Sequence, residues 1–415
     1  MLYDVIVIGG GASGMMAAIT AAQQNKAVLL LESSDRVGRK LLATGNGRCN
    51  FTHSNISVDD YYTDNREMLN SVLQKYPSES IISLFEAMGM MAKNLNDYIY
   101  PFSESASTVL DVLRIQLQEL NCYIKTECDV TEINENNHIF SVSGKHFCYE
   151  SKSVIVAAGS KAGGFYKGNQ NMYQLLKPFR HRCTKLYPAL TKCHCREDFF
   201  KALAGVRAKA NIHVYIDNQF LVSEFGEVQF TKTGISGIPV FQLSGSIAQH
   251  LSEKKKVTVS IDFIPDCKKS SLEIIKERLP IMKSCTVEQF FTGFLHKKLM
   301  SLFIKMAGLK EQDTVSQYSV KQLQKVIEIL RDFKTQISDV EGLENAQVCR
   351  GGIPLSECTD DFMSIYQNGL FMCGELLNVD GICGGYNLHF AWASGHICGL
   401  AAANYVTKHQ GETSA

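Results

Sequence analysis

The fold is indicated by residues 4–32, which read DVIVIGGGASGMMAAITAAQQNKAVLLLE. Val5–Ile8 is a run of β-branched apolar residues, as expected for a strand that is buried in a parallel sheet. Met15–Gln24 has the composition and length of a helix, and Ala27–Leu31 is a second apolar run of strand length. A strand, a glycine-rich turn, a helix and a second strand predict the first βαβ unit of a Rossmann-type domain.

The turn in this unit has the spacing G-x-G-x-x-G. Gly9 permits the tight turn, Gly11 lets the backbone approach a pyrophosphate, and Gly14 lets the helix pack closely on the sheet. Glu32 stands 18 residues after Gly14, where a carboxylate can accept hydrogen bonds from the ribose of an adenosine. The spacing does not distinguish FAD from NAD. The predicted binding residues of this unit are Gly9, Gly11, Ala12, Ser13, Gly14 and Glu32.

The composition of the chain limits its partners. Its 415 residues are 45% hydrophobic, which is enough for two or three globular subdomains. The 42 Lys and Arg residues equal the 42 Asp and Glu residues, and this balance favours neither a nucleic acid nor an anionic membrane. No apolar run reaches the roughly 18 residues of a membrane span. We therefore predict a small-molecule substrate, no nucleic acid and no membrane partner, and leave the oligomeric state open.

The cysteines indicate a reducing compartment. The chain has 14 of them, and its first residues run directly into the strand pattern, so we predict no export signal and a cytoplasmic protein. Cys193, His194 and Cys195 alternate too closely for a tetrahedral zinc site and have no second ligand pair at a suitable spacing. We therefore predict a surface turn at this place and no metal.

Two stretches further along the chain have additional dinucleotide-binding features. Residues 153–164, SVIVAAGSKAGG, form an apolar strand that ends in Ala-Ala-Gly, typical of the return strand of flavoproteins with two dinucleotide-binding domains. Leu370–Cys373 predicts another strand, and a helix is predicted over Leu388–Val406. The free N–H groups at the start of that helix would stabilise negative charge at the pyrimidine end of a flavin. Asp380 precedes it in a turn, and we expect this carboxylate to bond the ribityl or pyrophosphate region.

The middle of the chain has a different pattern. Residues 188–268 contain short β-branched runs, with Gly226 at an expected hairpin turn, and predict an antiparallel insert that also takes in residues 332–345. Residues 269–331 have apolar residues at helical spacing and predict three helices that cap the site. Phe290, Phe291 and Phe294 in these helices are either core residues or the lining of a hydrophobic substrate tunnel. Residues 1–187 and 346–415 then form the two parts of the dinucleotide-binding domain.

Seven motifs occur in an order that resembles one bacterial family. They are GGGASG, GRKLLATGNGRCNFT, IYPFSESASTVLDVL, VIVAAGSKA, FTKTGISGIPVFQLS, AQVCRGGI and CGELLNVDGICGGYNLHFAWASG. Together they are similar to FAD-dependent flavoproteins known as aminoacetone oxidases or NAD(P)/FAD-dependent oxidoreductases, a family that includes bile-acid 4,6-dehydro-reductases. The resemblance implies an α/β fold: a Rossmann-like FAD-binding domain of the two-dinucleotide-binding-domain type, with an inserted antiparallel β subdomain and a helical cap.

The resemblance also implies which residues hold the FAD. The segment Thr44–Asn50 would lie beside the flavin ring, where its glycines allow close approach and its amides offer hydrogen bonds. Arg39 and Lys40 would lie nearer the pyrophosphate. Beyond the first βαβ unit, the predicted FAD-binding residues are Arg39, Lys40, Thr44, Gly45, Asn46, Gly47, Cys49, Asn50, Val130, Ala158, Gly159, Gly374, Glu375, Asp380, Gly385, Tyr386, Asn387 and Leu388.

Three stretches depart from the usual pattern of the family. Lys167–Tyr173 stands where an acidic turn is common, Lys232 where a histidine is common, and Cys349-Arg350 where threonine is usual. We expect these departures to affect the substrate and not flavin binding. Cys49 has no C-x-x-C partner, so it is either a redox thiol with a distant partner or, more in keeping with the sequence, a small buried residue.

The predicted activity is hydride transfer between NAD(P)H, the flavin N5 atom and an unsaturated carbonyl or steroid-like, bile-acid-type substrate. The alternative is an amine or aminoacetone oxidase that passes electrons to oxygen. NAD(P)H would bind only transiently, because the chain has no second complete G-x-G-x-x-G. The predicted catalytic residues are Arg48, which can polarise a carbonyl, and Tyr100, which can donate a proton. Two rivals are a flavin-bound RNA-modifying factor, disfavoured by the neutral charge, and a protein that binds only NAD.

Overall fold

The computed structural model describes residues 1–165 and 172–409 and divides into two compact units. Residues 1–187 and 343–415 belong to the first unit, and residues 188–342 belong to the second. The two ends of the sequence therefore build one unit together. Of the unusual stretch Lys167–Tyr173, residues 167–171 lie outside the part of the chain that is described.

The first unit is built around a seven-stranded sheet. Its strands run in the order β7-β2-β1-β10-β9-β8, and β19 pairs with β10. The glycine turn lies at the carboxyl end of β1, which pairs in parallel with β2 on one side and β10 on the other. The strands are β1 (Leu2–Ile8), β2 (Val28–Leu31), β7 (Tyr123–Lys125), β8 (Val130–Asn136), β9 (Ile139–Gly144), β10 (Phe147–Val156) and β19 (Leu370–Met372).

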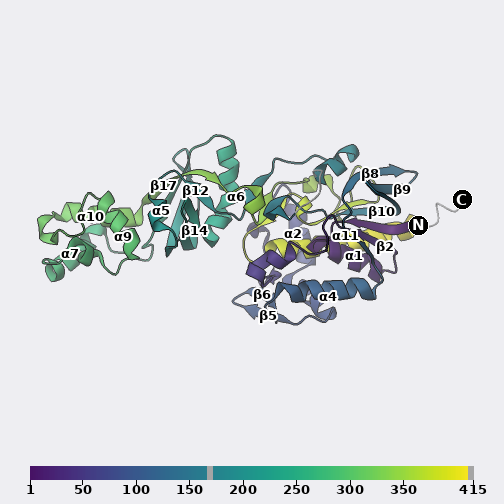
Figure 1. Cartoon of the computed structure of the whole chain (residues 1–415), viewed down its shortest axis with the longest axis horizontal. Coiled ribbons are helices and arrows are strands. Elements are labelled where there is room, and N and C mark those ends of the chain that lie inside the picture. Colours follow the sequence, from purple (N-terminus) through teal and green to yellow (C-terminus); the bar gives the residue numbers. More distant parts are fainter. Residues whose placement is uncertain (166–171, 410–415) are drawn as a thin grey trace. The chain divides into compact units, whose positions relative to one another are not determined.

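Two helices from opposite ends of the chain pack together against this sheet (Figure 1). They are α1 (Ala12–Gln23) and α11 (Tyr386–His409). Glycine makes the contact possible: a Cβ atom on Gly395 would lie 2.4 Å from the Ser13 carbonyl oxygen, and one on Gly399 would lie 2.5 Å from that of Ala17. The close packing of α1 and α11 brings the first turns of both helices into the same unit. The candidate site depends on both of these turns.

Smaller elements surround the sheet in this unit. A three-stranded sheet has the order β3-β6-β5, and β4 pairs with β20. The strands are β3 (Thr52–His53), β4 (Tyr61–Thr63), β5 (Ala92–Leu95), β6 (Tyr98–Pro101), β18 (Val348–Arg350) and β20 (Val379–Gly381). The helices are α2 (Arg66–Lys75), α3 (Ser78–Ala87) and α4 (Ala106–Glu119).

The second unit contains a closed antiparallel barrel in the order β12-β15-β14-β13-β16-β17. Its strands are β12 (Cys193–Cys195), β13 (Arg207–Ile216), β14 (Gln219–Phe230), β15 (Gly234–Ser236), β16 (Val257–Asp262) and β17 (Phe333–Val340). The helices α5 (Phe200–Leu203) and α6 (Ile238–Ser252) accompany them, and β11 (Tyr187–Ala189) lies at the boundary in the sequence.

Two local predictions in the barrel were wrong. Gly226 is not a hairpin turn, because β14 runs straight through it and Pro239 packs 3.2 Å from the position of its missing Cβ. The turn lies at Asp217 and Asn218, whose positive φ angles of 49° and 70° suit a two-residue hairpin. Cys193 is not in a surface turn either: it is fully buried in a barrel strand, and no group of metal ligands occurs among residues 1–165 and 172–409.

Four helices form the rest of the second unit, namely α7 (Ser271–Met282), α8 (Val287–Phe291), α9 (Lys297–Met306) and α10 (Val320–Arg331). Three helices were predicted here and four are present, because the chain turns at Gly293, between α8 and α9, where the φ angle is 95°. Phe290 and Phe291 are fully buried and pack edge to face, so they are core residues and not a tunnel lining. Within the described ranges, no helix is both long and apolar enough to cross a membrane.

Candidate functional site

The glycine turn after β1 combines two tight contacts with one open position. A Cβ atom on Gly9 would lie 2.4 Å from the Ala157 carbonyl oxygen, and one on Gly14 would lie 1.9 Å from that of Gly9. In contrast, a Cβ atom on Gly11 would meet nothing within 4 Å. The N-terminus of α1 has no side-chain cap and no acidic residue in its first turn. The turn is therefore packed against the sheet on one side and open to an anionic ligand on the other.

Glu32 is held in place by backbone N–H groups. Its carboxylate accepts hydrogen bonds from Gly10 at 2.8 Å and from Ser34 at 2.7 Å. These bonds fix the carboxylate at the end of β2, beside the glycine turn. Val130 begins β8, two residues after Cys128, whose N–H donates to the Glu32 carbonyl oxygen at 2.8 Å.

The segment Thr44–Asn50 has an unusual backbone. Gly45, Asn46, Gly47 and Cys49 have positive φ angles of 55°, 54°, 85° and 56°. The Cys49 side chain is fully buried, and burial raises the pKa of its thiol to about 12. A thiol with so high a pKa is a poor nucleophile at neutral pH, which supports a packing role for Cys49. Thr44 donates its hydroxyl hydrogen to the Leu41 carbonyl oxygen at 2.6 Å.

Asn50 joins this segment to the start of α11. Its side chain is 8% exposed, and its Oδ1 atom has no hydrogen-bond partner in the described part of the chain. A Cβ atom on Gly385 would lie 2.9 Å from that oxygen. A buried amide oxygen without a donor costs free energy unless a ligand supplies one. The position therefore fits a donor from a bound cofactor at the N-terminus of α11.

The cationic residues predicted near the pyrophosphate have protein partners. Lys40 forms an ion pair with Glu375 at 2.5 Å, and the other oxygen of Glu375 accepts the Cys349 N–H at 3.0 Å. Arg39 pairs with Asp35 at 3.5 Å on the surface. Lys40 and Glu375, both predicted as site residues, are thus brought into contact, whereas Arg39 is turned towards another group.

Asp380 is also engaged by a residue that the sequence reasoning did not select. Its carboxylate accepts hydrogen bonds from the Arg350 guanidinium at 3.1–3.2 Å, and that guanidinium lies 4.2 Å from the centre of the Tyr62 ring. Burial raises the pKa of Asp380 to about 6, against the opposing effect of Arg350. If Asp380 bonds the ribityl chain as expected, its carboxylate must accept hydrogen bonds from both the ribityl chain and Arg350. Arg350 is therefore part of the candidate site.

The remaining predicted residues lie at the ends of β10, β19 and β20. Gly159 follows Ala158 after β10, has a φ angle of 68°, and leaves open space where its Cβ atom would be. Gly374 donates its N–H to Ser394 at 3.0 Å. Asn387 bonds both backbone groups of Gly381, at 2.8 and 2.9 Å, so its amide closes the turn before α11 instead of facing a ligand. Tyr386 and Leu388 lie beside it in the first turn of α11.

The two predicted catalytic residues are in contact. The Arg48 guanidinium carbon lies 4.6 Å from the centre of the Tyr100 ring, and a Tyr100 ring carbon lies 3.9 Å from the position of a Cβ atom on Gly45. Burial raises the pKa of the Tyr100 phenol above its ordinary value, although Arg48 acts in the opposite direction. Tyr100 is therefore protonated at neutral pH. Arg48 also pairs with Glu104, which lies in the motif IYPFSESASTVLDVL but was given no predicted role.

A buried histidine couples the site segment to α11. His389 contacts the Thr52 hydroxyl through Nδ1 at 2.8 Å and the Tyr76 carbonyl oxygen through Nε2 at 2.9 Å. A neutral ring satisfies both partners if Nε2 carries the hydrogen. Burial lowers the pKa of His389 to about 4. The ring is thus neutral in the folded protein and helps to hold the strand that follows Asn50.

This histidine predicts a pH-dependent stability. The unfolded chain binds a proton below about pH 6.5, whereas the folded chain resists it down to about pH 4, so stability is lost as the pH falls through this window. Each pH unit corresponds to about 1.4 kcal/mol, or ~3 kcal/mol in all. The free energy of unfolding, measured in urea from pH 7 to pH 4.5, is expected to fall less steeply with decreasing pH in His389→Gln than in the wild type. Substitution of the exposed His146 by Gln should leave the slope unchanged; equal slopes for all three proteins would contradict the assignment.

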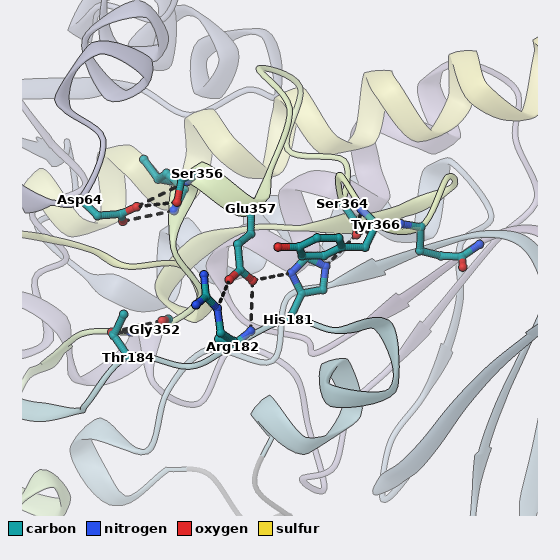
Figure 2. Close-up of polar contacts among 11 residues, drawn as sticks. Asp64, His181, Arg182, Thr184, Gly352, Ser356, Glu357, Ser364 and Tyr366 are labelled. Carbon is teal, nitrogen blue, oxygen red and sulfur yellow. Dashed lines mark hydrogen bonds and ion pairs between the residues drawn. The ribbon is translucent and has the colours of Figure 1, made fainter.

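A second polar cluster in the first unit has the order Ser–His–Glu (Figure 2). His181 contacts Glu357 through Nδ1 at 3.0 Å and Ser364 through Nε2 at 2.7 Å. The Ser364 hydroxyl oxygen accepts the N–H groups of Tyr366 and Gln367, so its hydrogen is directed to His181. Ser364 is only 1% exposed and cannot reach a substrate. The cluster therefore holds the chain together and is not a hydrolytic site.

With this geometry established, comparison with known proteins identifies the family. A sequence model of the HI0933-like protein Rossmann domain matches residues 3–401. The chain belongs to the HI0933-like family. Another finding agrees: the 3-dehydro-bile acid delta(4,6)-reductase of Clostridium scindens is 35% identical over 380 residues, which cover 91% of this chain and 92% of that protein. The family predicted from the motifs is confirmed.

Other members and structures extend the comparison. The ribosomal RNA dihydrouridine synthase of Haemophilus influenzae is 25% identical over 388 residues, covering 90% of this chain and 92% of that protein. The crystal structure of the 3-ketosteroid delta1-dehydrogenase of Sterolibacterium denitrificans has a TM-score of 0.51 at 13% identity, covering 97% of this chain and 99% of that one. This structural likeness concerns the fold. The predicted Rossmann-like FAD-binding fold in an α/β chain is confirmed, and the HI0933-like chain is an FAD-dependent oxidoreductase by family.

The residues of this chain fit FAD. Gly11 and Gly159 leave open space at the carboxyl ends of β1 and β10, where a dinucleotide lies in Rossmann-type domains. The Asn50 oxygen without a donor lies near the start of α11, at the opposite end of the expected cofactor. Gly11, Glu32, Gly159 and Asn50 are therefore the residues we expect to hold the FAD of this HI0933-like protein.

Proposed function

We propose that the protein is a reductase that uses NAD(P)H and its flavin to reduce a carbon–carbon double bond conjugated to a carbonyl, as in a steroid-like acid. The observation that carries this proposal is the contact of Arg48 with Tyr100 beside Gly45, which puts a cation next to a protonated phenol. The names of two relatives support it, because a delta(4,6) 3-dehydro-bile acid and a uridine share a double bond conjugated to a carbonyl.

The residues have distinct roles in this proposal. Bound FAD supplies the hydride chemistry at N5, with NAD(P)H as the source of the two electrons. Hydride adds to the carbon β to the carbonyl, and the electron pair of the double bond moves to the carbonyl oxygen. Arg48 stabilises the resulting oxyanion, and Tyr100 donates its hydroxyl proton to the α carbon. Water returns a proton to Tyr100, so the substrate gains two hydrogens as NAD(P)H becomes NAD(P)⁺.

An anaerobic titration tests the reductant. Purified protein is expected to be yellow, and NADPH or NADH should bleach its flavin band near ~450 nm within the time of one turnover. Addition of a 3-oxo-4,6-diene steroid acid should then restore the band and yield a product with two more hydrogens. If neither nucleotide bleaches the flavin but an amine or amino-ketone does, the oxidase alternative replaces the reductase.

Substitution of Tyr100 tests the proton donor. Tyr100→Phe is expected to slow steroid reduction by about 10²-fold, because a general acid contributes roughly that factor. Bleaching by NAD(P)H should keep its wild-type rate, since that half of the reaction needs no proton for the substrate. Stopped-flow absorbance separates the two halves. Unchanged turnover in Tyr100→Phe would make Tyr100 a packing residue.

A second candidate function is reduction of uridine in ribosomal RNA. It is favoured by the name of the Haemophilus relative and by the charge of residues 269–331, which contain eleven Lys or Arg and six Asp or Glu. Lys321 and Lys325 lie one turn apart on α10 and are exposed. Nucleoside mass spectrometry of unmodified ribosomal RNA incubated with protein and NADPH should reveal dihydrouridine. Reversal of both charges to Glu should abolish that product and spare steroid reduction; no dihydrouridine in the wild type removes this candidate.

A further inference from the structure

Glu104 connects two cations around Tyr100. One of its carboxylate oxygens pairs with the Arg48 guanidinium, and the other pairs with the Lys93 ammonium at 2.7 Å. Lys93 stands directly opposite Tyr100 in the antiparallel pairing of β5 with β6, so their side chains share one face of that small sheet. Arg48, Lys93 and Glu104 thus surround a residue that contacts the Gly45 loop.

Stability does not account for this arrangement. The side chains of Arg48, Lys93 and Glu104 are 44%, 35% and 32% exposed, and ion pairs with such exposure contribute about 0–1 kcal/mol. Glu104 also has a φ angle of 51° in the turn that its N–H closes on Pro101, a left-handed conformation that costs a non-glycine residue about 1 kcal/mol. A strained residue that contributes so little net stability suggests a function.

We propose that Arg48, Lys93 and Glu104 form an anion-binding site with one net positive charge beside the segment Thr44–Asn50. Glu104 is the positioning residue, because its carboxylate holds two cations that would otherwise repel each other. The ligand is the carbonyl oxygen of the substrate as it becomes an oxyanion, a statement that rests on the proposed function. A single net charge matches the single negative charge that develops on that oxygen.

The charge of the site can be measured without a substrate. Dithionite reduces flavins through a small radical anion, so the bleaching rate of the FAD-loaded protein at low ionic strength reports the local charge. Glu104→Gln should speed bleaching about two- to threefold, whereas Arg48→Ala and Lys93→Met should each slow it by a similar factor. Opposite signs from neighbouring substitutions would exclude a general loss of structure.

Asp4 offers a matched control. Its carboxylate pairs with Lys152 at 2.9 Å, but it lies at the amino end of β1, opposite the glycine turn. Asp4→Asn makes the same change of charge as Glu104→Gln and should leave bleaching unchanged. If Glu104→Gln alters the rate no more than Asp4→Asn, or if Arg48→Ala and Lys93→Met do not slow it, the anion site is refuted.

A double-substitution experiment tests the positioning role. Glu104→Gln should lower kcat for a conjugated ketone about tenfold and change KM much less. The interaction that is lost stabilises the oxyanion, which forms only in the transition state. In an Arg48→Ala/Lys93→Met background it should have no further effect, because both cations that it positions are gone. Additive effects would overturn the positioning role. If the wild type reduces no conjugated carbonyl at all, the proposed function fails, while the dithionite rates still decide the anion site.

Discussion

Gly11→Ala is expected to give a protein that folds normally and purifies without its yellow colour. A Cβ atom at this position meets no protein atom within 4 Å, so the substitution costs the apoprotein little. The same Cβ atom would occupy the space through which a pyrophosphate approaches the backbone. We expect the dissociation constant of FAD to rise by about two orders of magnitude, or ~3 kcal/mol. Isothermal titration of the apoprotein measures this constant, and circular dichroism checks the fold.

Gly14→Ala is the matched comparison, since it adds the same methyl group three residues later. Its Cβ atom would lie 1.9 Å from the Gly9 carbonyl oxygen, so α1 would have to move away from the sheet. We expect this variant to lose stability before any ligand is added, with a lower melting temperature as apoprotein. If Gly11→Ala retained tightly bound FAD, or if Gly14→Ala melted like the wild type, the two glycines would not have the separate roles assigned to them.

Glu357→Ala is expected to destabilise the folded protein by about 3–5 kcal/mol. The Glu357 side chain is 2% exposed and accepts hydrogen bonds from His181 and from both the backbone and the side chain of Arg182, at 3.0–3.1 Å (Figure 2). Its removal leaves the buried Nδ1–H of His181 and the Arg182 N–H without an acceptor. The loss is measured as the free energy of unfolding in urea.

Arg182→Ala separates the buried part of this network from the exposed part. The Arg182 side chain is 82% exposed, so its ion pair with Glu357 is screened by water and contributes about 0–1 kcal/mol. This variant leaves Glu357 bonded to His181 and to the backbone. A loss in Arg182→Ala as large as that in Glu357→Ala would mean that the exposed guanidinium, and not the buried histidine, carries the network.

Periodicity and spacing located the elements of the FAD-binding fold because those signals are local. The β-branched run before Gly9 and the glycine spacing after it describe β1 and the start of α1 within a few residues. The same kind of signal failed at Gly226 and at Cys193. A glycine, or two cysteines separated by one residue, can occur in a turn or in a strand. The two cases are distinguished only by the strands that pair across the barrel.

Local sequence signals predicted only some of the residues of the candidate site. The sequence selected Arg48, Tyr100 and Asp380 from three distant motifs, and the fold brought the first two into contact. Arg350 was noted as a departure from the family pattern, but its ion pair with Asp380 spans 30 residues and depends on the meeting of β18 and β20. Glu104 lies in the motif IYPFSESASTVLDVL but was assigned no role, because a single acid in a polar turn is ordinary.

The sequence by itself indicated a dinucleotide cofactor and predicted where its phosphates bind, since a glycine turn between strand and helix works through backbone geometry that a few adjacent residues specify. Only the tertiary structure decided how the charges are distributed around Tyr100. Glu104, Lys93 and Arg48 are brought together by the pairing of β5 with β6 and by the left-handed Gly45 loop. Electrostatic interactions depend on distance in space and on burial, and neither can be read from local patterns in the sequence.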